Sequence, residues 1–388
     1  MDIAERMKNI SPSVTLTMDA RVKQLQAGGT DIINFSVGEP DFRTPEVICE
    51  AAQKAIQEGF HKYTPVGGIL SLREKIGKYL YTNYGVSYNP NQIIVSCGAK
   101  HSLYNAILAL VNPGDEVLIP VPFWGTYPEQ VKLAGGVPVF VNCPEANQFK
   151  LDLKQLAEKI TPKTKVLILN YPNNPTGATL TRSELEKLAE IIVQNNIWVL
   201  SDEIYSKLTY NGDHCCFSSI SNEIYNRTIL INGVSKTFSM TGWRIGYAAG
   251  APSIIKAMTD LQSHSTSNPT SISQKASEAA LQMDETEIQK MISTFRKRRD
   301  LISSRLNQIA GVHCLEPEGA FYVFPNVSKI LKQVSINTTL DFSEFLLEKA
   351  QIAVTPGEAF GFEGYLRISY ATSEKNIEEG IRRFSKVI

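Results

Sequence analysis

The stretch "KTKVLILNYPNNPTGATLTRSELEKLAEIIVQNNIWVLSDE", residues 163–203, predicts the fold of this chain. It begins with an apolar run that stops at a proline and ends with a second apolar run that stops at two acids. Between these runs, Thr181 and Glu184 have the spacing of a capping box, which predicts a helix over 181–196. The near-continuous Val, Ile and Leu of both runs are typical of strands in a parallel sheet that is covered on both faces.

The same alternation of strand and helix continues on both sides of this stretch. Helices are predicted at 98–115 and 125–136, each ending near glycine. Further strands are predicted at 91–97, 116–121, 137–142, 227–235 and 244–250. We therefore expect an α/β fold whose large domain holds a mostly parallel seven-stranded sheet covered by helices.

The pattern changes after residue 250. Residues 270–308 contain no proline or glycine, which predicts one long helix or two. The run "RKRRD" (296–300) inside it is expected to form a solvated helix face. The segments 319–324, 342–354, 364–370 and 374–388 predict a smaller α+β unit. We expect an N-terminal arm (1–35) packed on this unit, a large domain (36–285) that contains the sheet and the ligand site, and a small C-terminal domain (286–388).

Composition excludes several classes of protein. A length of 388 residues suggests about two domains, and 39 Lys+Arg against 39 Asp+Glu give no net charge. Nucleic acid and anionic membranes are therefore not expected as partners. The N-terminus lacks the apolar region of a secretory signal, and no run is long enough to span a membrane. The six cysteines are scattered without metal-binding spacing, so we expect a cytoplasmic protein with reduced thiols and no metal site.

Polar and aromatic residues follow five of the predicted strands. Ligands of open parallel sheets bind at the carboxyl ends of the strands, so these residues are expected to meet there. Each has an ordinary structural explanation as well: a buried tryptophan is usually core, "NNPTG" is a good turn, and "SDE" could cap a helix. The residues in question are Gly98, Ala99 and Lys100, then Trp124, Asn174, Asp202, Tyr205 and Lys236.

Taken together, these residues fit one cofactor, pyridoxal 5′-phosphate. Lys236 offers an amine for a Schiff base with the cofactor aldehyde. Asp202 is expected to keep the pyridine nitrogen protonated. Tyr205 and Asn174 are candidates for the ring's 3-oxygen, and Trp124 can stack on the ring. The phosphate group is expected to bind Arg244, Ser235 and the helix N-terminus at Gly98, Ala99 and Lys100.

Seven motifs carry a resemblance that covers the chain from about residue 14 to its C-terminus. They are "SVGEPDF", "YTPVGGILSLR", "NYPNNPTG", "SDEIY", "SKTFSMTGWRIGY", "EGAFYVF" and "LRISYATS". In this order they resemble a pyridoxal phosphate-dependent class I aminotransferase of fold type I, most closely the bacterial aspartate aminotransferases. One position departs from the pattern, because some relatives carry serine where this chain has Gly233.

The resemblance implies roles for individual residues. Lys236 would hold the cofactor and move the proton, and Arg367 would grip the substrate α-carboxylate. Asn174 would contact this carboxylate too, and Gly38 would let it approach the backbone. Tyr63 would reach the phosphate of the partner subunit's cofactor, which implies a homodimer with shared active sites.

The substrates are less sharply indicated. We expect an amino acid such as aspartate and a 2-oxo acid such as 2-oxoglutarate. Lys100 either reads the distal carboxylate of a dicarboxylic substrate or only belongs to the phosphate loop. An aromatic or other amino donor remains an alternative, as does a β-eliminating lyase. A ligand-sensing regulator is disfavoured because no basic DNA-binding module is seen, and a dehydrogenase because "GxGxxG" is absent after the first strand.

Overall fold

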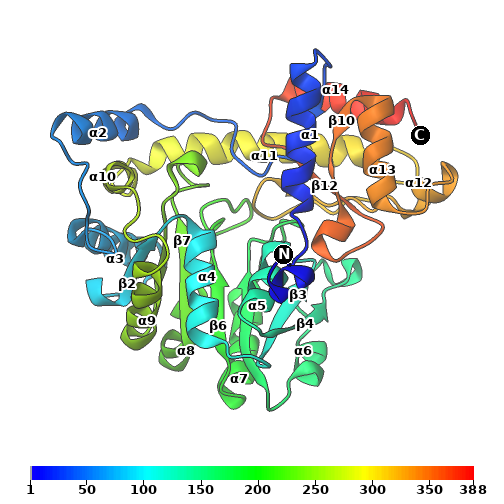
Figure 1. Ribbon diagram of the computed structural model, residues 1–388. Coiled ribbons are helices and arrows are strands. Elements are labelled where there is room, and N and C mark those ends of the chain that lie inside the picture. Colours follow the sequence, from blue (N-terminus) through cyan, green and yellow to red (C-terminus); the bar gives the residue numbers. More distant parts are fainter. Residues whose placement is uncertain (1) are drawn as a thin grey trace.

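The computed structural model describes residues 2–388 and has a seven-stranded sheet at its centre (Figure 1). Strand β8 runs antiparallel to both its neighbours, and all other neighbouring strands are parallel. The predicted fold class is therefore confirmed. In spatial order the strands are β2 (Ile93–Ser96), β8 (Gly246–Ala249), β7 (Thr228–Gly233), β6 (Trp198–Asp202), β5 (Thr164–Asn170), β3 (Glu116–Val121) and β4 (Val137–Asn142).

Helices cover both faces of this sheet. In β5, Val166 and Ile168 pack with one apolar cluster while Leu167 and Leu169 pack with another, as the period of two in a strand requires. The first cluster includes residues of α4 (Ala99–Leu110), α5 (Thr126–Leu133) and α9 (Pro252–Ser263). The second includes residues of α6 (Leu153–Lys159), α7 (Arg182–Gln194) and α8 (Asn222–Arg227).

A third apolar cluster joins the sheet domain to the C-terminal part. It contains buried residues of α2 (Glu46–Gln57), α3 (Leu70–Tyr84), α10 (Ser271–Ala280) and α11 (Glu285–Asn307). The apolar period over 270–308 thus corresponds to two helices, the second of the two options. The chain breaks before α11 because the Asp284 side chain accepts a hydrogen bond from Thr286 N and caps the new helix. Figure 1 shows α11 crossing above the sheet toward the C-terminal elements.

The arginine-rich run on α11 is the predicted solvated face only in part, because Arg296, Lys297 and Asp300 are exposed whereas Arg298 and Arg299 are buried. Arg298 and Arg299 are only 8% and 6% exposed. A run of charges looks solvated in sequence, but arginine can be buried where carboxylates, carbonyl oxygens and aromatic rings receive its guanidinium. Arg298 donates a hydrogen bond to the carboxylate of Asp41, and Arg299 donates one to the carbonyl oxygen of Pro317.

The C-terminal part is the expected mixture of helices and short strands. Its sheet has the order β11 (Thr355–Pro356), β12 (Leu366–Ser369) and β9 (Tyr322–Val323). Strand β9 is much shorter than the predicted 319–324. The helices are α12 (Ser328–Gln333), α13 (Thr339–Phe345), a π-helical turn (Leu346–Ala350) and α14 (Glu374–Ser385).

The N-terminal residues contact these C-terminal elements. Helix α1 (Val14–Ala27) packs Met18 and Val22 against Leu347 and Ala353, and β1 (Ile33–Asn34) pairs with β10 (Ile352–Ala353). Figure 1 shows α1 beside α13. Met1 of the predicted arm lies outside the described residues, and the proposed boundaries at 35 and 285 remain predictions. Among residues 2–388, no helix combines the length and the apolar character needed to cross a membrane.

Candidate active site

A cavity of about 340 Å³ lies at the carboxyl ends of the central strands. It brings together most of the residues that the sequence predicted for the site, although they come from segments hundreds of residues apart. The predicted residues that line it are Gly38, Ala99, Lys100, Trp124, Asn174, Asp202, Tyr205, Ser235, Lys236, Arg244 and Arg367.

Two predicted residues do not line this cavity. Gly98 precedes the lining residue Ala99 and has a φ of 87°, and a Cβ there would lie 2.5 Å from Nη2 of Arg244. Glycine is therefore needed for both its backbone conformation and the close approach of the guanidinium. Tyr63 is 92% exposed and lies away from the cavity of its own chain.

Lys236 follows β7 by three residues and is partly buried in the cavity wall. Its Nζ donates a hydrogen bond to the carbonyl oxygen of Gly38 at 2.5 Å. Burial lowers the pKa of this amine to about 8; Glu39 opposes the shift, whereas Arg367 and Arg244 add to it. A lysine with such a pKa is partly neutral near physiological pH and can act as a nucleophile.

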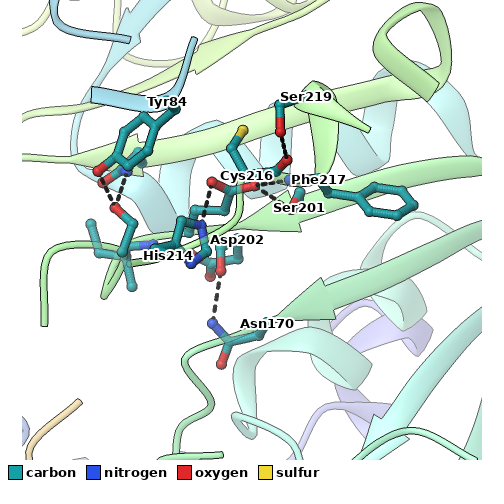
Figure 2. Close-up of polar contacts among 12 residues, drawn as sticks. Tyr84, Asn170, Ser201, Asp202, His214, Cys216, Phe217 and Ser219 are labelled. Carbon is teal, nitrogen blue, oxygen red and sulfur yellow. Dashed lines mark hydrogen bonds and ion pairs between the residues drawn. The ribbon is translucent and has the colours of Figure 1, made fainter. Parts of the chain in front are cut away.

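Asp202 ends β6 opposite Asn170 of β5, so the strand register brings the two side chains together. Asn170 Nδ2 donates to the backbone oxygen of Asp202 at 2.9 Å, and both residues are labelled in Figure 2. Tyr127 Oη donates to Asp202 Oδ2 at 2.8 Å. Burial raises the pKa of Asp202 to about 6, against the hydrogen bond from Tyr127, which favours the ionised form.

A second buried acid, Glu203, fixes the turn that carries Asp202. Its carboxylate accepts hydrogen bonds from Ser201 Oγ at 2.9 Å and Phe217 N at 3.1 Å, and it contacts His214 Nε2 at 2.8 Å. Figure 2 shows Ser201 and Phe217 above and to the right of Asp202, with His214 to its left. These contacts tie the end of β6 to the following loop, so the backbone beside Asp202 is held firmly.

The other end of the cavity is rich in hydrogen-bond donors. Ser235 and Arg244 face the N-terminus of α4, whose first backbone N–H groups have no partner inside the helix. Ser96 of β2 is paired with Gly246 of β8, which brings the start of α4 next to Arg244. A Cβ on Gly246 would lie 2.1 Å from Ala99 N, so glycine permits this approach. Amide N–H groups, a hydroxyl and a guanidinium form a donor set suited to a phosphate.

Arg367 of β12 is the largest fully buried side chain, with 2% of its surface exposed. Its guanidinium lies 4.6 Å from the Tyr322 ring centroid and 5.0 Å from that of Phe360. Its hydrogen-bond acceptors among the described residues are neutral: Asn174 Oδ1, Ser36 O and Thr355 Oγ1. Its Nε has no hydrogen-bond partner among them. A buried cation with neutral partners that faces a cavity is suited to binding a carboxylate.

Two further predicted residues have specific neighbours. Tyr205 Oη lies 2.9 Å from Tyr322 Oη, with either hydroxyl able to donate. Lys100 Nζ lies 4.7 Å from the ring centroid of Trp124, over its face. Burial, and next the charge of Arg244, lower the pKa of Lys100. The Trp124 indole therefore carries a cation on one face within the same cavity.

Sequence reasoning missed several residues of this cavity: Tyr127, Asn170, Ile204, Thr241 and Tyr322. Tyr127 stands three residues after Trp124, whose carbonyl oxygen accepts a hydrogen bond from Tyr127 N, and Asn170 lies near the end of the predicted strand 163–172, so both carried a usable signal. Tyr322 stands in "EGAFYVF", where nothing in the local pattern separates it from a core aromatic. The N-terminal residues Ser13, Thr15 and Leu16 also reach the cavity.

Comparison with known proteins agrees with this geometry. Residues 30–384 match the family "Aminotransferase class I and II". The chain is 48% identical to the aspartate aminotransferase of Geobacillus stearothermophilus, with 100% of this chain and 98% of the relative covered. It is 45% identical to a probable aspartate/prephenate aminotransferase of Aquifex aeolicus, with 100% and 98% covered.

A solved structure shows the same similarity in three dimensions. The aspartate aminotransferase of Thermus thermophilus with maleate superposes with a TM-score of 0.95 at 39% identity, and the whole of each chain is covered. The fold, the cavity and these matches together show that the chain is an enzyme of amino-group transfer and belongs to the class I and II aminotransferase family.

Proposed function

We propose that this enzyme binds pyridoxal 5′-phosphate and moves the amino group of L-aspartate, or a similar amino acid, to 2-oxoglutarate. The observation that carries the proposal is the arrangement of three charged groups around one cavity. Lys236 supplies an amine of lowered pKa, Asp202 a buried carboxylate, and Arg367 a buried guanidinium with neutral partners.

The residues around the cavity fit the proposed cofactor in size and chemistry. The N-terminus of α4, Ser235 and Arg244 would hold its phosphate, with Gly98 leaving room for the guanidinium. Asp202 would hold the ring nitrogen, Tyr205 and Asn174 its 3-oxygen, and Trp124 would lie against the ring. When bound, the cofactor supplies an electron sink for the bond broken at the substrate Cα.

Lys236 would carry out the proton transfer. Its side chain lines the cavity, and its pKa of about 8 would let its Nζ take a proton from the substrate Cα and give it back. Asp202 would keep its charge in the loaded enzyme because Tyr127 donates to Oδ2 and a protonated ring nitrogen would face it.

Arg367 would orient every substrate by its α-carboxylate. The two terminal nitrogens of its guanidinium match the two oxygens of a carboxylate. Asn174 would contact the same group, because its Oδ1 already fixes one edge of the guanidinium. Gly38 leaves the required space: a Cβ there would lie 2.8 Å from Tyr322 Oη and 3.8 Å from Nη1 of Arg367.

Lys100 would read the distal carboxylate of a dicarboxylic substrate. It lines the cavity, lies over Trp124 and has the charge that a second carboxylate needs. The names of the Geobacillus and Thermus relatives, which refer to aspartate, support this assignment.

We also propose a homodimer with shared active sites. Tyr63 is 92% exposed although it is a large aromatic residue, and Val47, Ile56 and Leu70 nearby in sequence are exposed too. Mixing a Tyr63→Ala variant with a Lys236→Ala variant tests the sharing. If the sites are shared, Tyr63→Ala alone loses activity and a mixed dimer regains one complete site. If they are independent, Tyr63→Ala alone keeps full activity, because Tyr63 does not line the cavity of its own chain.

A steady-state assay tests the proposed function. Rates measured against aspartate at several 2-oxoglutarate concentrations should give parallel lines in double-reciprocal plots, and Lys236→Ala should remove turnover while the protein stays folded. A β-eliminating lyase would instead release ammonia without any 2-oxo acid. That outcome, or full activity in the Lys236→Ala variant, would overturn the proposal.

A further inference from the structure

We propose that Arg298, which lies outside the cavity, is a positioning residue that acts through Asp41 to hold the glycine segment (residues 36–44) in place for substrate binding. The inference rests on the proposed function, and it concerns a residue that the proposed mechanism does not use. It explains why an arginine from a charged run is buried in α11.

The position of the glycine segment decides how much space a carboxylate finds next to Arg367. Ser36 O accepts a hydrogen bond from Arg367 Nη2 at 2.6 Å, so the segment touches the guanidinium directly. Gly38 lines the cavity, where even an added Cβ would lie 2.8 Å from Tyr322 Oη. A displacement of about 1 Å at such a place can cost substantial binding and rate.

The cavity side holds this segment at three places. Lys236 Nζ donates to Gly38 O at 2.5 Å, Thr241 Oγ1 donates to Glu39 Oε2 at 2.8 Å, and Thr44 Oγ1 donates to the carbonyl oxygen of Ser239 at 2.7 Å. The first of these contacts uses the free amine. When Lys236 is joined to the cofactor, its nitrogen is no longer a free ammonium, so the remaining contacts must hold the segment.

Arg298 holds the glycine segment from outside the cavity through an ion pair with Asp41. Its Nη1 donates to Asp41 Oδ1 at 2.7 Å, and the side chains of the pair are 10% and 31% exposed. Its guanidinium also lies 5.3 Å from the ring centroid of Phe42 and 5.9 Å from that of Phe295. One arginine thus holds two consecutive residues of the segment, by charge and by stacking. A partly buried ion pair is worth more than an exposed one, because water screens it less.

Helix α11 holds Arg298 in a fixed position, because the helix is itself packed in the core. The helix is 23 residues long and buries Phe295 and Ile302 in the core on the same side as Arg298 and Arg299. Arg298 therefore sets the segment relative to a helix that is itself held by the core.

The adjacent Arg299 offers a matched control. It is buried to a similar degree and stacks on an aromatic ring, with 5.0 Å from its guanidinium to the centroid of Tyr210. Its polar partners are Asp300, Glu316 and the carbonyl oxygen of Pro317, none of which belongs to the glycine segment. Replacing either arginine should cost similar stability, but only Arg298 should affect substrate binding.

The test compares Arg298→Met, Asp41→Asn and Arg299→Met in the cofactor-loaded enzyme. KM and kcat are measured for aspartate and 2-oxoglutarate, and the dissociation constant for maleate, an unreactive dicarboxylate, is measured by absorbance titration. Thermal unfolding and cofactor affinity are measured in parallel. For Arg298→Met and Asp41→Asn we expect KM and the maleate dissociation constant to rise about tenfold, with a smaller change in kcat and unchanged cofactor affinity.

The double variant Arg298→Met/Asp41→Asn should be no worse than Arg298→Met alone, since the two residues act through one contact. Equal rises in KM for Arg299→Met and Arg298→Met would show a general loss of stability and overturn the inference. So would unchanged maleate binding in Arg298→Met. A failure of the proposed function is distinguishable from both, because the wild-type enzyme itself would then not turn over these substrates.

Discussion

Tyr127 Oη donates a hydrogen bond to Asp202 Oδ2 over 2.8 Å, which joins the first turn of α5 to the end of β6. This bond opposes the effect of burial, which raises the pKa of Asp202 to about 6. In the proposed function Asp202 stays charged to hold a protonated ring nitrogen, and it then depends on one phenol for part of its ionisation.

The variant Tyr127→Phe tests this dependence. Loss of the hydrogen bond raises the pKa of Asp202 further, so the carboxylate loses its charge at a higher pH. A hydrogen bond to a charged group is worth about 1.5 kcal/mol or more, which predicts a roughly tenfold weaker affinity for pyridoxal phosphate. Titration of the cofactor-free protein with pyridoxal phosphate between pH 6 and 8 measures it. Identical affinity to wild type across this range would show that Tyr127 has no such role.

Asp202→Asn should stabilise the cofactor-free protein while it impairs the function. The pKa of Asp202 is raised from 3.8 to about 6 on folding, so the folded state binds the proton more tightly than the unfolded state. Stability is therefore lost as pH rises from about 4 to about 6, and the full penalty applies above that. We expect the variant to exceed wild type by about 1–3 kcal/mol at pH 7.5, with a smaller difference at pH 5. Denaturant unfolding at the two pH values measures this difference in the free energy of unfolding. A difference that does not change with pH would contradict the dependence of stability on the protonation of Asp202.

Replacing Arg367 should weaken the binding of all substrates alike. Arg367→Lys keeps the charge but loses the planar fork, and Arg367→Ala loses both. We expect KM for aspartate and 2-oxoglutarate to rise about tenfold in the first variant and about 100-fold in the second. Steady-state kinetics with both substrates provide the measurement. An unchanged KM in Arg367→Ala would remove the residue from substrate binding.

Replacing Lys100 should lower kcat/KM only for substrates with a second carboxylate. Lys100→Met keeps most of the length of the side chain that lies over Trp124 while it removes the charge. We expect kcat/KM for aspartate to fall about 10–100-fold and that for alanine to change little. The ratio of the two values is the readout. Equal losses for both amino acids would place Lys100 in the phosphate loop instead, the alternative that the sequence left open.

The sequence predicted the sheet and most cavity residues because both depend on local order along the chain. Strand β5 ends at Asn170 and β6 at Asp202, and parallel strands bring such ends to one edge. The role of Tyr127 was missed because its partner is 75 residues away. Arg298 was misjudged for the same reason, since the carboxylate of Asp41 that allows its burial is 257 residues away. The local pattern of residues predicts the period of a helix, but it does not predict which distant residue will pair with a charged side chain.

The most direct test of the proposed function is an absorbance spectrum of the protein loaded with pyridoxal phosphate, recorded after aspartate and again after 2-oxoglutarate. The band of the bound cofactor should bleach with aspartate and return with 2-oxoglutarate, and Lys236→Ala should show neither change. A band that does not change with aspartate but bleaches with another amino acid would contradict the proposal of a dicarboxylic substrate. A protein that gives no band with added pyridoxal phosphate would contradict the cofactor and the proposed role of Lys236.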